Sequence, residues 1–135
     1  MTRSPAADQD ASEDFRVRAA ARKREAMRQR LLDATLAACS AETIRNPALI
    51  DDVIRLAEVS RGTFYKYFDS MEEATRELGR VLMREMVDNV ALVLQDIRSP
   101  AERVIAGPLL YLARAAQDAQ WGAFVSGIDH LAEGP

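Results

Sequence analysis

The sequence predicts an all-α protein, and three observations support this prediction. Apolar residues recur three and four positions apart along most of the chain, which is the spacing of one helix face. No segment alternates between polar and apolar residues in the manner of a strand. Capping patterns with serine or asparagine stand just before the long apolar stripes. We find no internal repeat and expect a single succession of helices.

The composition is ordinary for a soluble globular protein, with 48% apolar and 29% charged residues among 135. This length supports one core, or a small domain with part of another. No apolar run approaches the roughly 20 residues that span a bilayer, so we expect no membrane partner. The polar, acidic N-terminus is unlike a signal peptide. The single cysteine, Cys39, excludes an internal disulfide framework and fits a reducing cytoplasm, where we expect the protein to reside.

The first helix is expected after a polar tail. Residues 1–14 are predicted to be disordered because they are polar and contain proline. From Phe15 the chain is rich in alanine and arginine, which favour helix formation. We expect this helix to reach about Ala41 and to bury one apolar face. That face consists of Leu31, Leu32, Thr35, Leu36 and Cys39.

Two shorter helices are expected next. In Asn46–Pro47 the asparagine is a suitable cap and the proline a suitable first residue, so a helix is predicted over residues 47–57. Ser60 is expected to cap a helix over residues 61–68. Phe64 and Phe68 lie four residues apart on that helix and are expected to face the core. The buried residues expected on the preceding helix are Ile50, Val53, Ile54 and Ala57.

The second half of the chain predicts three more helices. Ser70 and Glu73 form a capping-box pattern before a helix over about residues 71–97, and Ser99–Glu102 repeats the pattern before another. Pro108 lies inside this later helix, and because proline removes an amide donor we expect a kink or a break. A short helix is predicted over about residues 121–131. Five side chains could line a pocket, although core packing is the favoured interpretation: Met83, Met86, Tyr111, Trp121 and Phe124.

The most informative stretch is Val59 to Phe68, which reads Val-Ser-Arg-Gly-Thr-Phe-Tyr-Lys-Tyr-Phe. An amphipathic helix, a tight turn and a short helix with aromatic and basic residues have the layout of a helix-turn-helix. This segment resembles the DNA-binding domain of the tetracycline-repressor-like (TetR) family of bacterial transcription regulators. The resemblance covers about residues 22–82 and is most specific between Val59 and Phe68. It implies that residues 15–70 form a three-helix domain that binds double-stranded DNA.

DNA recognition needs side chains that reach base edges and others that hold phosphates. Arg61 is suited to bond guanine bidentately, and Gly62 allows a close approach of the backbone. Thr63 offers a hydroxyl and a methyl group, Tyr65 suits a phosphate or a thymine methyl, and Lys66 suits a phosphate. For the arginine and tyrosines, surface exposure or packing is the alternative. The predicted DNA-binding residues are Arg22, Arg24, Ser60, Arg61, Gly62, Thr63, Tyr65, Lys66 and Tyr67, the last resembling a phosphate-contacting position of the family.

The charge distribution supports this prediction better than the net charge does. The net charge of −3 alone argues against nucleic acid. Between Phe15 and Arg30, however, seven basic residues stand against the single acid Glu25. A clustered basic arm matters more for phosphate binding than the charge of the whole chain. A solvated helix face is the alternative. The basic residues are Arg16, Arg18, Arg22, Lys23, Arg24, Arg28 and Arg30.

Three positions depart from the family pattern. Glu58 stands in place of the family's turn glycine, which is preferred where φ is positive, so a glutamate there either costs about 1 kcal/mol or is accommodated by a changed turn. Ile54 stands in place of a small alanine, so a wider helix crossing is expected. Met71 stands in place of a lysine that grips phosphate. The lost cation and the added acid weaken nonspecific affinity, and the basic arm is expected to compensate.

Residues 71–135 correspond to only the opening of the helical C-terminal domain of family members. On the resemblance, the chain is therefore truncated, or it dimerises through other surfaces. The resemblance implies a homodimer on a palindromic operator, acting as a repressor, with a small-molecule effector as a further partner. It assigns no ligand-binding residue.

Two other functional classes compete with this interpretation. The first is a helical interaction module, a regulator remnant with little specific DNA binding, which Glu58, Met71 and the short C-terminal region favour. The second, an enzyme, is the weakest. His130 is the only histidine, and the sequence holds no phosphate loop, nucleophile–base pair or metal-spaced Cys/His cluster. We therefore expect no catalytic site, no cofactor and no metal.

Overall fold

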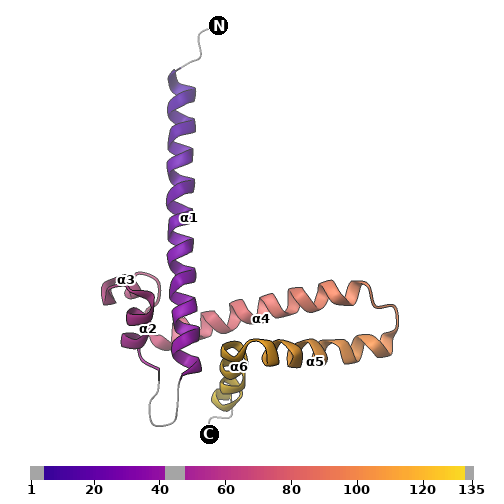
Figure 1. The fold of residues 1–135 in the computed structure, drawn as a ribbon. Coiled ribbons are helices and arrows are strands. Elements are labelled where there is room, and N and C mark those ends of the chain that lie inside the picture. The colour runs from indigo at the N-terminus through magenta and orange to yellow at the C-terminus, as the bar shows by residue number, and fades with distance from the viewer. Residues whose placement is uncertain (1–4, 42–47, 133–135) are drawn as a thin grey trace.

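The computed structural model describes residues 5–41 and 48–132, and within these ranges the chain is helical without strands, so the all-α prediction is confirmed (Figure 1). Six helices follow one another: α1 Pro5–Ser40, α2 Ile50–Ala57, α3 Arg61–Tyr65, α4 Met71–Gln95, α5 Pro100–Gln117 and α6 Ala119–Ala132.

Two elements project from the part of the molecule where the helices meet. The C-terminal part of α1 contacts α2, α4 and α6, whereas its N-terminal part extends alone beyond α2 and α3 (Figure 1). Helices α4 and α5 run antiparallel and form an arm on the other side of α1 (Figure 1). Helix α6 packs against α1, so the last described helix contacts the first.

The core lies where α1 crosses the shorter helices. Phe64, Leu31 and Val53 are completely buried there, and Phe68 is 3% exposed, so the predicted inward-facing aromatics are confirmed. Thr35 is buried as well, and its hydroxyl donates to the Leu31 carbonyl oxygen at 2.8 Å, which satisfies the polar group. Burial of such side chains is the main force that holds the short helices against α1.

Residues 5–14 form the first turns of α1 rather than the predicted disordered tail. Alanines in this stretch favour helix formation. Polar composition alone therefore misjudged this segment. Helix α1 ends at Ser40, one residue from the predicted end.

Helices α2 and α3 are both shorter than predicted. Ala48 and Leu49 are not helical, and α2 begins at Ile50, where Asp52 accepts the Leu49 amide at 3.1 Å. The predicted Asn46–Pro47 cap lies outside the described residues. Helix α3 ends at Tyr65 rather than Phe68, although the Phe68 amide still donates to the Phe64 carbonyl at 3.0 Å.

Of the two alternatives for Glu58, a left-handed residue or a changed turn, the structure shows the left-handed conformation, with φ 53° and ψ 47°. Its amide donates to the Arg55 carbonyl at 3.3 Å, and the Val59 amide donates to the Ile54 carbonyl at 3.0 Å. These two bonds close the end of α2 and hold the turn in spite of the side chain at Glu58.

The arm differs from the predictions in two details. Ser70 caps α4 by accepting the Glu73 amide at 3.1 Å, but the Glu73 carboxylate accepts from the Asp69 amide at 2.5 Å rather than from the cap residue. Helix α5 runs unbroken through Pro108, so of the expected kink or break the break is absent. Gly107 before it carries no Cβ, which removes the clash that normally keeps a pre-proline residue out of the helical region.

Four of the five side chains that were considered as a pocket lining pack in the core. Trp121, Phe124 and Met86 are buried, and the Tyr111 ring packs edge-on to Trp121 with centroids 5.2 Å apart. Met83 is exposed on a different face of α4. The favoured interpretation as core packing therefore holds for four of the five.

An ion-pair network ties α1 to α4. The Arg28 guanidinium donates to Glu77 at 2.5 Å and lies 6.0 Å from the centroid of the Phe68 ring, and Arg80 contacts the other Glu77 oxygen at 3.3 Å. The hydrogen bond from Arg28 holds the pKa of Glu77 below its ordinary value, against the opposing effect of burial. This network links the projecting helix to the arm.

We expect Glu58→Gly to stabilise the fold by about 1 kcal/mol, because glycine relieves the left-handed strain and the gain exceeds its entropic cost. Chemical denaturation would measure this difference. Glu85→Gly, in the exposed middle of α4, is the matched control and should destabilise by about 1 kcal/mol. Destabilisation by both variants would contradict the strain at Glu58.

The stabilising effect of Glu77 should depend on pH. Because its pKa is lowered in the folded protein, its contribution is present above the ordinary pKa of 4.5 and is lost as the pH falls through the folded value. The difference in unfolding free energy between the wild type and Glu77→Gln should therefore be largest near neutral pH and shrink below pH 4.5. A difference that stays constant across this range would argue against the ion pair, and Glu85→Gln serves as the exposed control.

Candidate nucleic-acid interface

The short helix α3 is built so that one side is fixed and the other is free. Ser60 caps it by accepting the Thr63 amide at 3.1 Å, and the two hydroxyl oxygens lie 2.9 Å apart. Phe64 anchors the inner side in the core, with its ring 5.8 Å from that of Phe68. A five-residue helix gains its stability from this packing and this cap rather than from its own hydrogen bonds.

The outer side of α3 presents most of the predicted DNA-binding residues to solvent. Arg61, Gly62 and Lys66 are exposed, and the Tyr65 side chain is 46% exposed. Thr63 and Tyr67 are half-buried, and Tyr67 also packs against the core. Both functions considered for Tyr67, packing and surface contact, are therefore compatible with its place.

Arg61 has a partner that the sequence analysis missed. Its guanidinium forms an ion pair with the carboxylate of Asp51 from the first turn of α2, and both side chains are more than half exposed. The ten-residue separation gave no local signal for this contact, which depends on how the turn folds α3 back onto α2. The ion pair leaves some N–H donors of the guanidinium free and limits the orientations that the Arg61 side chain can take.

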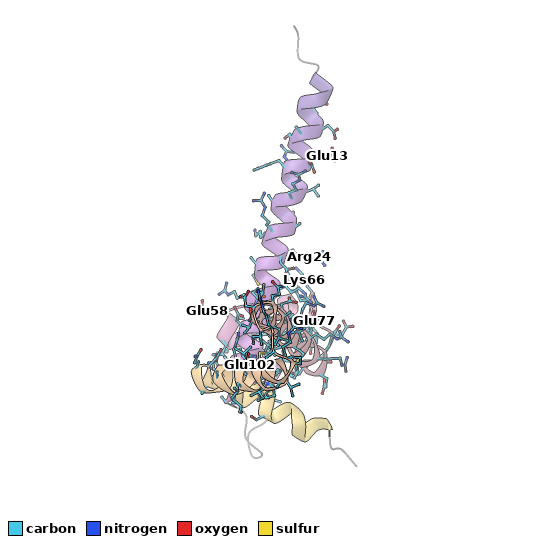
Figure 2. All side chains as sticks on the ribbon, turned by 90° about the vertical axis from the view of Figure 1, so that its right-hand side faces the viewer. Glu13, Arg24, Glu58, Lys66, Glu77 and Glu102 are labelled. Atoms are coloured by element: carbon cyan, nitrogen blue, oxygen red, sulfur yellow. The ribbon has the colours of Figure 1, made fainter. Side chains whose placement is uncertain are left out.

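A basic cleft of about 530 Å³ lies between α1 and α3. Lys23 and Arg24 line it from α1, and Lys66 and Tyr67 line it from the end of α3. Figure 2 shows Arg24 and Lys66 close to each other at the base of the projecting part of α1. The remaining lining residues are Ala20, Met27 and Thr63. Three cations from two elements thus gather beside the outer side of α3.

The structure brings Arg24 to this cleft but leaves Arg22 on the open surface of α1. Lys23, which was counted in the basic arm but not among the predicted site residues, belongs to the cleft. A helical wheel over residues 20–27 places Lys23 and Arg22 on different sides of α1. It identifies the side that faces the cleft only when the position of α3 is known. All side chains from residues 9 to 26 are exposed, so the basic arm is a free helical rod.

Each of the three residues that depart from the family pattern contacts another part of the structure. Glu58 lies 3.5 Å from Arg30, which partly compensates its charge at the turn. Met71 is half-buried and packs on the core instead of offering a cation. Ile54 is half-buried against the same core. The cations that line the cleft beside α3 come from α1 and from the end of α3.

A larger cleft, of about 1000 Å³, follows one face of α4. Met71, Met83 and Val87 supply apolar surface, and the arginines of α4 stand along it at four-residue intervals. These arginines are Arg76, Arg80 and Arg84. The described residues hold no group of three His, Cys, Asp or Glu side chains suited to a metal ion.

Comparison with the profiles of known protein families, with curated proteins and with solved structures finds no match to this chain. None of the described helices combines the length and apolarity that crossing a bilayer requires. Function is therefore inferred from the residues and their geometry.

Proposed function

We propose that this protein is a sequence-specific, double-stranded-DNA-binding transcription regulator that represses by occluding a promoter. The observation that carries the proposal is the capped, outward-facing helix α3 beside a cleft with three cations. Phosphate contacts supply affinity and register, and base-edge contacts supply specificity. Both kinds of side chain occur on this one surface.

Specificity is assigned to the exposed side chains at the start and middle of α3. Arg61 lies at the N-terminal end, which enters the major groove in helix-turn-helix proteins, and its free donors suit guanine O6 and N7. Gly62 is exposed, and a methyl group in its place would meet no atom closer than the Ser60 hydroxyl oxygen at 3.9 Å, so the surface around it is open to a ligand. Tyr65 supplies a hydroxyl and an apolar ring on the same short helix.

Affinity is assigned to the basic cleft and to the rod that continues from it. Lys23, Arg24 and Lys66 suit a strand of the sugar–phosphate backbone that passes between α1 and α3. The exposed basic residues further along α1, including Arg16 and Arg18, extend this positive surface, although Arg18 is paired with Asp14 at 2.7 Å. The net charge of −3 is compatible with this function because the cations are clustered.

The proposal includes a symmetric homodimer, because two recognition helices about 34–36 Å apart bind a palindrome far more tightly than one. It places the protein in the cytoplasm, where bacterial DNA is found. A small-molecule effector remains a prediction, and the apolar, arginine-lined cleft on α4 is the site at which we would search for it. No cofactor is part of the proposal.

A helical interaction module is the second candidate. Glu58 at the turn and Met71 at the start of α4 reduce the positive charge near α3, and the arm exposes several large apolar residues. This candidate predicts association with a protein and no preference among DNA sequences.

Arg61→Ala and Tyr65→Ala should each weaken binding to the preferred DNA by about 1–3 kcal/mol and reduce the preference over scrambled DNA, because each removes a base-edge contact. Fluorescence anisotropy with DNA from upstream of the protein's own gene would measure both affinities. Arg98→Ala, an exposed arginine between α4 and α5, is the matched control and should bind as the wild type does. Equal, salt-sensitive binding of the wild type to both DNAs would favour the interaction module.

Lys23→Ala and Lys66→Ala should each lower the salt dependence of binding. Each lost phosphate contact reduces the slope of log affinity against log salt by about 0.9, while the preference among sequences stays the same. Titrations at several salt concentrations give this slope. An unchanged slope in both variants would show that no phosphate lies in the cleft.

A further inference from the structure

The protein exposes far more surface than its mass requires. The chain of 15.0 kDa exposes 10244 Å², whereas a compact monomer of that mass exposes about 7000 Å². The projecting part of α1 and the arm formed by α4 and α5 both contribute to this excess (Figure 1). The excess on the arm has a particular character, because α5 contains no buried residue although it is rich in apolar side chains.

Helix α5 is apolar on two opposite sides. The side turned to α4 and α6 is half-buried and consists of Ala106, Leu110, Tyr111, Arg114 and Ala115. On the other side Ile105, Leu109 and Leu112 are 57%, 58% and 61% exposed, and Ala116 is exposed in line with them. These four residues, which we name the outer stripe, fall within about 60° of one another on a helix.

The spacing of the outer stripe is four, three and four residues. This is the alternation by which two helices pack side chains of one into spaces of the other along a seam. A surface helix needs only one apolar face to pack on the core. The outer stripe is a second apolar face on the opposite side of α5, and a further helix is required to cover it.

The absence of charge on the outer stripe indicates which kind of helix can pack on it. Arg103 is engaged away from it, donating to the Ile97 and Leu94 carbonyls at 2.7 and 3.2 Å, and Arg114 lies 5.5 Å from the centroid of the Trp121 ring. The outer stripe itself carries no charge, so it offers nothing to DNA or to a charged peptide. An identical neutral stripe is complementary to it.

We propose that the outer stripe of α5 is a homodimer interface in which the α5 helices of two copies pack antiparallel about a two-fold axis. In this orientation Leu109 of one copy meets Leu112 of the other, and the larger Ile105 meets the smaller Ala116. Glu102, one turn before Ile105, decides the orientation. Antiparallel packing places the two Glu102 carboxylates at opposite ends, whereas parallel packing sets them against each other.

The size of the stripe sets the strength of the association. A standard interface buries about 800 Å² per partner, which is more than four side chains on one helix supply. We therefore expect a dimer with a dissociation constant in the micromolar range, of the order of 10 µM. Such a dimer would bring two copies of α3 together on a palindrome, and only that last consequence rests on the proposed function.

Sedimentation velocity of the full chain without DNA tests the interface between about 1 µM and about 200 µM. The wild type should approach twice the 15.0 kDa of one chain, and Leu109→Glu should remain monomeric throughout. Val104→Glu is the matched control, because Val104 is 76% exposed on the same helix but lies outside the outer stripe. Circular dichroism and thermal unfolding establish that each variant keeps its helices.

A charge-pair rescue tests the orientation. Leu109→Glu and Leu112→Lys should each abolish the dimer, and the double variant should restore it, because in the antiparallel register each new carboxylate faces a new ammonium group of the other copy. Failure of the double variant to associate would overturn that register. A monomeric wild type at all concentrations, or an unchanged dimer of Leu109→Glu, would overturn the interface. Neither outcome depends on DNA binding. A monomeric wild type would also remove the homodimer from the proposed function, whereas the titrations of Arg61→Ala and Tyr65→Ala test base recognition separately.

Discussion

The burial of Phe64 and Phe68 in the core is the contact on which the rest of the candidate site depends. Helix α3 has five residues, too few to persist alone, and these two rings hold it at a fixed place while its other side stays in solvent. The Ser60 cap and the left-handed Glu58 then fix where α3 begins and how the chain enters it. Aromatic burial and surface presentation are thus two consequences of one packing arrangement.

Positive charge is clustered locally although the net charge of the chain is negative. Ion pairs decide which of the cations are left to contact a ligand. Asp51 holds Arg61, Arg30 lies near Glu58, and Arg28 is committed to Glu77 at the junction of α1 and α4. The cations of the cleft, Lys23, Arg24 and Lys66, have no such acidic partner among the described residues, so their charge is available to a ligand. A local surplus of this kind is compatible with a DNA-binding function in an acidic protein.

The arm differs from the basic cleft in that its outer stripe is apolar rather than charged. Along α5 the inner side packs on α4 and α6, while the outer stripe remains in solvent. Exposed apolar surface of this regularity is costly in water, and association of two copies removes it without any new segment of chain. Recognition and association are in this way assigned to different ends of the molecule.

The sequence by itself determined the helical class, the order of the helices, most caps and the inward Phe64 and Phe68, because these follow from local spacing and local hydrogen bonds. The resemblance to a family with a glycine at this turn left a positive φ at Glu58 or a changed turn open, and the structure shows the positive φ. The sequence misjudged residues 5–14 and the start of α2, where weak local preferences compete, and of the kink or break expected at Pro108 the break is absent. Only the tertiary structure decided that Asp51 meets Arg61, that Lys23 joins Lys66, and that α5 keeps an uncovered stripe. Those contacts join residues from different helices, and their geometry depends on packing that no local pattern records.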